Sequence, residues 1–179
     1  MFPNLLTTIR IIAAPILVVL LIFNTYNMML FGLFIFVIAS ITDFLDGYFA
    51  RLFNQKSKIG KILDPIADKL LVSSALIGLI SIQIITGIHI IIATIIILRE
   101  IFVSGLREFS NSKNLNVNWM TKFKTSFQMV SIIFLIPSSY INYFNIDLLF
   151  FGLILLWLAS ILSLITAYKY FLLVISDQE

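Results

Sequence analysis

Stretches of about 20 apolar residues alternate with short polar connectors along the whole chain, and a helix of this length crosses a lipid bilayer. We therefore predict an all-α, polytopic membrane protein with six transmembrane helices. These helices run roughly over residues 5–23, 28–52, 59–85, 88–109, 120–139 and 148–173.

The composition supports this fold class. Only 12% of the 179 residues are charged, whereas 60% are hydrophobic, and the mean hydropathy is +1.07. A soluble domain of this size needs more charged residues to cover its surface, so we predict one membrane domain over residues 1–179. The net charge of +3 does not indicate nucleic-acid binding, because the basic residues form no soluble patch with interleaved aromatic residues. The lack of cysteine excludes disulfides and thiolate chemistry.

The basic residues are distributed unevenly over the predicted connectors. With six helices, all 12 Lys and Arg residues fall on or toward the side that holds both termini. The connectors at 24–27, 86–87 and 138–147, on the other side, contain none. Because cytoplasmic segments carry the excess of Lys and Arg, we predict that both termini are cytoplasmic.

Four aspartates, Asp43, Asp46, Asp64 and Asp68, interrupt the second and third apolar stretches. Residues three and four apart share one face of a helix, so each pair forms one acidic stripe. The two helices are antiparallel, and counting residues places both stripes at a similar depth, toward the cytoplasm. Because charges within a membrane are costly, we predict that these aspartates form a functional site in a polar cavity open to the cytoplasm.

Four neighbouring carboxylates cannot all stay ionised without counter-charge. Ligands that are all oxygen, with no histidine nearby, favour hard cations, so we predict Mg²⁺ or Mn²⁺, as two ions. Two such ions stabilise both the attacking and the leaving oxygen in a phosphoryl displacement. Arg51 and the basic segment 56–58 lie beside the aspartates and are suited to hold phosphate oxygens.

The acidic residues belong to a longer pattern, Asp-x2-Asp-Gly-x2-Ala-Arg-x8-Gly-x3-Asp-x3-Asp, which fills residues 43–68 without a departure. This pattern resembles the signature of the CDP-alcohol phosphatidyltransferases. Blocks at 3–10, 63–69, 98–108 and 122–129 look most like the bacterial phosphatidylglycerophosphate synthases of that family. The resemblance reaches about residue 130, and the last two helices carry little signal beyond hydrophobicity.

The resemblance implies a multi-pass enzyme of the bacterial cytoplasmic (inner) membrane that works as a homodimer in phospholipid biosynthesis. It transfers the phosphatidyl group from CDP-diacylglycerol to sn-glycerol 3-phosphate, and phosphatidylglycerol phosphate and CMP are the products. By the same resemblance, four aspartates are metal ligands, and Asp68 is also the base that takes the proton of the acceptor's hydroxyl group. The residues that correspond to CDP-diacylglycerol-binding positions are Gly47, Arg51, Ser57 and, more loosely, Thr8.

The signature does not choose the acceptor. A phosphorylated acceptor needs further cations, and we predict that Arg99, Arg107 and Lys124 bind its phosphate. Two alternatives remain open at this stage. In the first alternative, Arg99 and Arg107 pair with the neighbouring glutamates at 100 and 108. Lys124, together with Lys122, alternatively anchors the start of a helix at the membrane surface.

Two other functions compete with this interpretation. A cardiolipin synthase of the same family uses phosphatidylglycerol as its acceptor, and other members use serine or an inositol phosphate. A cation-coupled transporter is a different class of protein with carboxylates inside the membrane. Transporter sites usually lie near the midplane between repeats, whereas these aspartates lie toward the cytoplasm and no repeat is visible. The pattern therefore favours the enzyme.

Overall fold

The structure is a computed structural model that describes residues 2–52, 58–109, 119–140 and 147–176. Within these residues the chain folds into six α-helices and one short 3₁₀ helix, with no strand, which confirms the predicted all-α class. The elements are α1 (Phe2–Phe23), α2 (Tyr26–Leu52), α3 (Lys58–Ser81), α4 (Ile88–Phe109), α5 (Trp119–Leu135), η1 (Ile136–Ser139) and α6 (Leu148–Ser176).

Two helices are shorter than the sequence predicted. The third was expected to continue to residue 85, but α3 ends at Ser81. The chain then turns through Gln83 and Gly87, whose φ angles are 60° and 55°. The fifth was expected to be one helix to residue 139, but α5 ends at Leu135 and η1 follows. Pro137 lies in η1 and has no backbone N–H to continue the α-helical hydrogen bonds.

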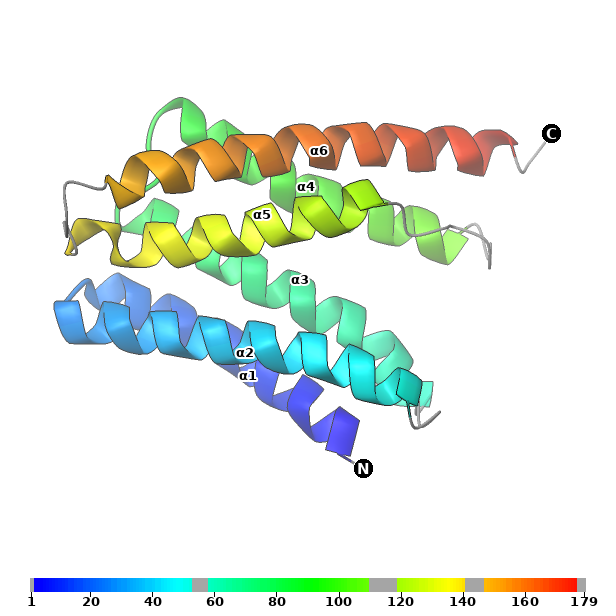
Figure 1. Ribbon diagram of the computed structural model, residues 1–179, viewed down its shortest axis with the longest axis horizontal. Helices are drawn as coiled ribbons and strands as arrows, with labels where there is room; N and C mark the ends of the chain where they lie inside the picture. The colour runs from blue at the N-terminus through cyan, green and yellow to red at the C-terminus, as the bar shows by residue number, and fades with distance from the viewer. Residues whose placement is uncertain (1, 53–57, 110–118, 141–146, 177–179) are drawn as a thin grey trace.

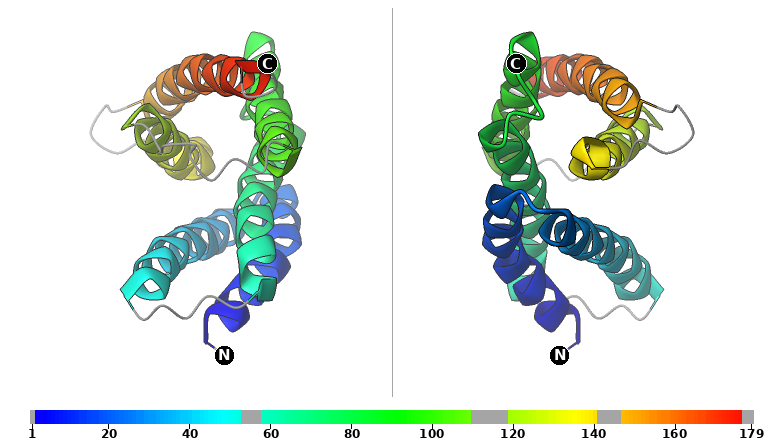
Figure 2. Two further views of the ribbon diagram at one scale, coloured as in Figure 1. Left: turned by 90° about the vertical axis from the view of Figure 1, so that its right-hand side faces the viewer. Right: turned by 90° about the vertical axis from the view of Figure 1, so that its left-hand side faces the viewer.

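The six helices form two groups of three (Figure 1). In the amino-terminal half, α1 packs along both α2 and α3, and in the carboxy-terminal half, α6 packs along both α5 and α4. Seen along the helices, α3 and α4 line a common side of the molecule, and α2 and α5 lie apart from that side (Figure 2). Both termini lie at the same end of the helices, as an even number of antiparallel helices requires.

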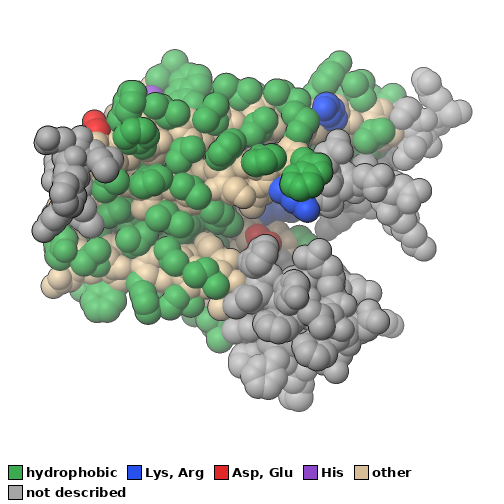
Figure 3. Space-filling view, in the orientation of Figure 1, with side chains coloured by type: hydrophobic (Ala, Val, Ile, Leu, Met, Phe, Trp, Pro, Cys, Tyr) green, Lys and Arg blue, Asp and Glu red, His purple; other side chains and the backbone are tan. Residues whose placement is uncertain are grey.

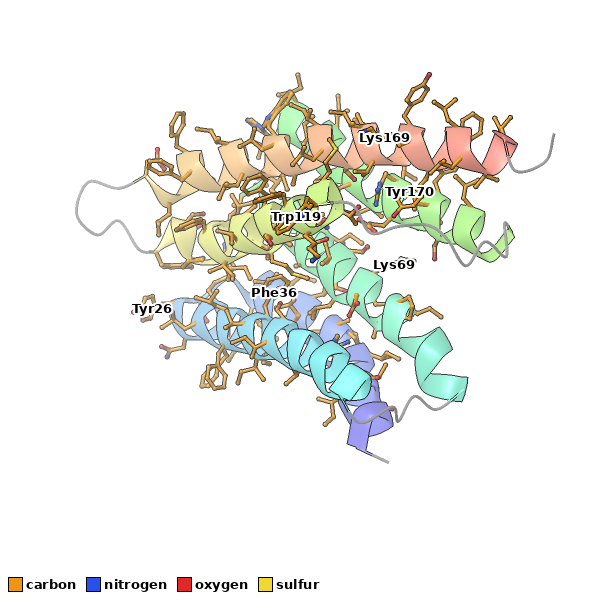
Figure 4. All side chains as sticks on the ribbon, turned by 45° about the vertical axis from the view of Figure 1, so that its right-hand side comes forward. Tyr26, Phe36, Lys69, Trp119, Lys169 and Tyr170 are labelled. Atoms are coloured by element: carbon orange, nitrogen blue, oxygen red, sulfur yellow. The ribbon has the colours of Figure 1, made fainter. Side chains whose placement is uncertain are left out.

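Apolar side chains fill the space between the helices. Leu17, Leu21, Phe36 and Leu76 are fully buried and belong to one continuous core, with Phe36 inside the bundle in Figure 4. Glycines allow two of the closest approaches. A Cβ atom at Gly78 of α3 would lie 2.6 Å from the Leu21 side chain of α1, and one at Gly152 of α6 would lie 2.8 Å from Leu135 of α5.

The outer surface is also largely hydrophobic (Figure 3). Large apolar side chains such as Phe31, Leu98 and Ile101 are exposed. Among the described residues, Ile88–Leu106 and Leu148–Ile175 are long and apolar enough to cross a membrane, and Thr7–Phe23 and Tyr26–Thr42 are shorter apolar helices. The number of spans and the cytoplasmic cavity therefore stay predictions.

Candidate functional site

The described part of the signature pattern lies in α2 and α3, two consecutive helices that contact each other. The last turns of α2 carry Asp43, Asp46, Gly47 and Arg51, and the first turns of α3 carry Asp64 and Asp68. Asp68 is the one acid of this set whose side chain is described. The side chains of the other residues, and Ser57 as a whole, lie outside the described part of the chain.

Asp68 is held by an arginine from another helix. Nη1 of Arg10, on α1, donates a hydrogen bond to Oδ1 of Asp68 over 2.9 Å. The Arg10 side chain is only 1% exposed, whereas that of Asp68 is 37% exposed. A charge as deeply buried as Arg10 requires an anionic partner, and Asp68 supplies one. The contact therefore fixes one oxygen of the carboxylate.

Lys69, the residue after Asp68, makes a polar contact with the carboxy-terminal half of the molecule. Nζ of Lys69 donates a hydrogen bond to Oγ of Ser104 on α4. Figure 4 shows Lys69 at the side of α3 that faces α4. Ser104 follows Glu100 by four residues, so the two lie on one face of α4. This face of α4 thus contacts α3 through Ser104 and carries the Glu100 carboxylate one turn earlier.

Glu100 pairs with two cations. Nζ of Lys124, on α5, donates a hydrogen bond to its Oε1, and Nη1 of Arg99 lies 3.5 Å from the same oxygen. The side chains of Lys124 and Arg99 are 4% and 5% exposed, and that of Glu100 is 17% exposed. The pairing of Arg99 with Glu100, which the sequence left open, is therefore present. Lys124 is buried and is not a surface anchor.

Arg99 also joins α4 to α6. Its Nε donates to the backbone oxygen of Ser163 over 2.9 Å, and its Nη2 donates to Oγ1 of Thr166 over 2.5 Å. Both residues are buried. The last helix therefore contributes directly to the surroundings of a residue that the sequence placed in the acceptor site.

We call these three groups of contacts together the polar layer. It contains Arg10 of α1, Asp68 and Lys69 of α3, Arg99, Glu100 and Ser104 of α4, Lys124 of α5, and Ser163 and Thr166 of α6. It links five helices. On the face shown in Figure 3, acidic and basic side chains meet between the two halves.

Three of the predicted site residues lie in this layer. Asp68, Arg99 and Lys124 belong to it. Thr8, on α1, is exposed. The side chain of Arg107, on α4, is not among those described.

Sequence reasoning did not single out Arg10, Glu100 or Thr166 as site residues. A signal existed for Arg10, because it is the one charged residue of its apolar stretch, and such a charge calls for a partner. Glu100 follows Arg99 directly, but nothing in the sequence shows that it reaches Lys124. Thr166 is a hydroxyl residue within a long apolar helix and carries no local signal.

The residues present fit the predicted metal ions. Carboxylate oxygens are the ligands that Mg²⁺ and Mn²⁺ prefer, and α2 and α3, which carry all four aspartates, lie in contact. Asp68 remains partly exposed beside its bond to Arg10. Among the described side chains no group of three or more acidic or histidine ligands occurs, since three of the four aspartate side chains are outside them.

Comparison with known proteins defines the class. The sequence model of the CDP-alcohol phosphatidyltransferase family matches residues 1–165. The chain belongs to the CDP-alcohol phosphatidyltransferase family. Membership of this lipid-synthesising family, together with the apolar helices, makes it a membrane protein.

Relatives from several bacteria carry the name CDP-diacylglycerol–glycerol-3-phosphate 3-phosphatidyltransferase. The relative from Rickettsia bellii (strain RML369-C) is 41% identical over 172 residues, which cover 94% of this chain and 92% of that protein. The relative from Salmonella choleraesuis (strain SC-B67) is 37% identical over 162 residues, with coverage of 87% and 88%. The relative from Cereibacter sphaeroides is 47% identical over 139 residues, with coverage of 73% and 60%.

Proposed function

We propose that the protein transfers the phosphatidyl group of CDP-diacylglycerol to sn-glycerol 3-phosphate, and so forms phosphatidylglycerol phosphate and CMP in phospholipid biosynthesis. The family match and the shared name of relatives that cover most of the chain support this reaction. The observation that carries the choice of a phosphorylated acceptor is the polar layer. In it, the buried cations Arg99 and Lys124 share Glu100 of α4, and Ser104 on the same face of α4 contacts Lys69, the residue after Asp68.

In this reaction the hydroxyl oxygen of the acceptor attacks the phosphorus that carries diacylglycerol, and the bond from that phosphorus to the CMP oxygen breaks. Asp68 takes the proton of the attacking hydroxyl group. A base must be held within hydrogen-bonding reach of the proton it removes, and Arg10 fixes the carboxylate of Asp68 from α1. Gly47, Arg51, Ser57 and Thr8 are proposed to bind the donor.

We propose Asp43, Asp46, Asp64 and Asp68 as the ligands of two Mg²⁺ or Mn²⁺ ions. Bound there, such ions supply positive charge that stabilises the attacking and leaving oxygens. The support is the donor set itself, four carboxylates on two helices that contact each other.

The phosphate of the acceptor needs cations from the carboxy-terminal half, and we propose Arg99, Arg107 and Lys124. Desolvated cations bind phosphate oxygens more strongly than exposed ones, and Arg99 and Lys124 are both buried. Six transmembrane spans, cytoplasmic termini, a homodimer and a bacterial inner-membrane location complete the proposal.

The test uses the purified full chain in lipid nanodiscs with CDP-diacylglycerol and MgCl₂. Acceptors are offered one at a time: sn-glycerol 3-phosphate, phosphatidylglycerol, serine and inositol phosphate. We expect CMP release and a phosphatidylglycerol phosphate product with sn-glycerol 3-phosphate alone, and loss of both on addition of EDTA. A product formed only with phosphatidylglycerol identifies a cardiolipin synthase instead. No CMP release with any acceptor rejects the enzyme and favours the transporter.

A further inference from the structure

The guanidinium group of Arg99 is held along one edge by α6. Its Nε and Nη2 atoms form that edge, and they donate to the Ser163 backbone oxygen and to Thr166 Oγ1. The Thr166 hydroxyl oxygen also lies 2.9 Å from the backbone oxygens of Leu162 and Ser163. Because its single proton is directed to one of those carbonyls, its lone pairs face the arginine as acceptors.

The remaining terminal nitrogen of Arg99 lies on the opposite side, toward Glu100 and Lys124. Nη1 is 3.5 Å from Glu100 Oε1, the same oxygen that Lys124 contacts. Two cations thus converge on one carboxylate, and the three groups together carry a formal charge of +1. A planar guanidinium fixed along one edge presents its other donors in a set direction, which is what recognition of a phosphate requires.

We propose that Thr166 is a positioning residue for acceptor recognition, and that it acts by orienting Arg99 toward the phosphate of sn-glycerol 3-phosphate. This inference rests on the proposed function, because it takes Arg99 to be a phosphate-binding residue. It gives α6 a part in selecting the acceptor. The family match ends at residue 165, so Thr166 lies immediately outside the matched part of the chain.

The Thr166 side chain is the group to change, because the bond from Arg99 to Ser163 goes to the backbone. The Ser163 hydroxyl is buried and makes no hydrogen bond within the described part of the chain, so the side chain of Ser163 does not hold Arg99. Thr166→Val keeps the shape of the side chain and removes only the oxygen that accepts from Nη2. Thr166→Ser keeps that oxygen, and Thr166→Ala removes it without filling the space.

The experiment measures CMP release by the full-length protein in nanodiscs while sn-glycerol 3-phosphate and CDP-diacylglycerol are varied separately. We expect T166V and T166A to raise KM for the acceptor about tenfold, which corresponds to about 1.4 kcal/mol. The KM for CDP-diacylglycerol and kcat should change by less than about twofold, because the donor site is untouched. T166S should restore the wild-type acceptor KM.

Ser131→Ala is the matched control. Ser131 is a fully buried hydroxyl residue of α5 that donates to the Gly152 backbone oxygen of α6 over 2.7 Å, so its loss weakens helix packing without touching Arg99. Its acceptor KM should equal that of the wild type. The inference is overturned if the acceptor KM of T166V and T166A is unchanged, or if it rises together with the KM of CDP-diacylglycerol. A wild-type protein inactive with sn-glycerol 3-phosphate overturns the proposed function as well, whereas an active wild type with unaffected variants overturns the inference alone.

Discussion

The amino-terminal half, α1–α3, and the carboxy-terminal half, α4–α6, show their chemistry in different ways. The first carries a dense signature of acidic and small residues at fixed spacing, which identifies the reaction class from the sequence. The second carries scattered charges whose roles become clear only from contacts between helices, such as Lys124 with Glu100. Functional residues that are close in the sequence, on two consecutive helices, leave a sequence motif, whereas contacts between α4, α5 and α6 do not.

We propose that the first half carries out catalysis and that the second half binds the acceptor. Variants of the first half should therefore lower kcat, and variants of the second half should raise the KM of the acceptor.

The largest effect is expected for Asp68→Asn. The amide keeps the size of the side chain but cannot take the proton, and general-base catalysis contributes about 10²- to 10⁴-fold to a rate. We expect kcat to fall by about 10³-fold or more, measured as CMP release at saturating substrates. Asp147→Asn is the matched control, because Asp147 is exposed and caps α6 through a hydrogen bond from the Phe150 N–H, which asparagine also accepts. Activity of D68N near that of D147N would contradict the role of Asp68.

The next largest effect is expected for Arg10→Met. Without Arg10 the carboxylate of Asp68 loses the bond that orients it, and misplacing a reacting group by about 1 Å costs up to about 10²-fold in rate. We expect kcat to fall by about 30- to 100-fold with little change in either KM, and Arg10→Lys to recover part of the loss. Binding of Mn²⁺, followed by electron paramagnetic resonance, gives a second readout that does not depend on turnover.

Lys169→Met, which removes an exposed cation on α6, should leave both readouts of the Arg10 experiment unchanged. If Arg10 acts through Asp68, R10M should add no further loss in the D68N background. Additive losses would mean that Arg10 acts elsewhere.

A smaller effect, confined to the acceptor, is expected for Lys124→Met. Removing a buried cation that contacts the proposed phosphate site should raise the KM of sn-glycerol 3-phosphate by about 10-fold or more, because charge-assisted bonds are among the strongest in a binding site. Lys122→Met is the matched control on the same helix. Lys122 is exposed and lies 5.2 Å from the centroid of the Trp119 ring, so its loss should leave that KM unchanged. If K122M and K124M raise the acceptor KM equally, the buried Lys124 has no special role in binding the acceptor.

The sequence predicted the number and positions of the helices because apolar stretches and polar connectors set them directly. It missed the end of α3 and the change from α5 to η1. These depend on a turn at Gln83 and Gly87 and on the missing N–H of Pro137, which are backbone effects within apolar sequence.

The candidate site shows the same limit. The four aspartates were found because three- and four-residue spacings lie on one face of a helix. Arg10 pairs with Asp68 from 58 residues away, and Arg99 contacts Thr166 from 67 residues away. Local spacing in a single sequence contains no information on such pairs, so they required the packed structure.

The smallest effects should come from the two glycines that set the helix spacing in each half. Gly152→Ala brings a Cβ atom to 2.8 Å from Leu135, with the Leu135 backbone nitrogen at 3.4 Å, and Gly78→Ala brings one to 2.6 Å from the Leu21 side chain. Overpacking of this kind costs about 1–3 kcal/mol, so both variants should unfold at lower temperature. G152A should be the more destabilised variant, because its new methyl group also meets the Leu135 backbone, which cannot move aside as easily as a side chain. Gly105→Ala, with nothing within 4 Å of the added atom, should be neutral or slightly stabilising.

The two glycine variants should also change different kinetic constants. Gly78 sets the spacing of α1 and α3, which carry Arg10 and Asp68. At temperatures at which G78A is still folded, its loss of activity should therefore appear in kcat. Gly152 sets the spacing of α6 and α5, which carry Thr166 and Lys124. Overpacking at Gly152 pushes these helices apart, which loss of the Ser131 hydroxyl does not, so the defect of G152A should appear in the KM of sn-glycerol 3-phosphate. If both variants lower kcat and leave the acceptor KM unchanged, the two halves form one catalytic unit, and the division between chemistry and recognition fails.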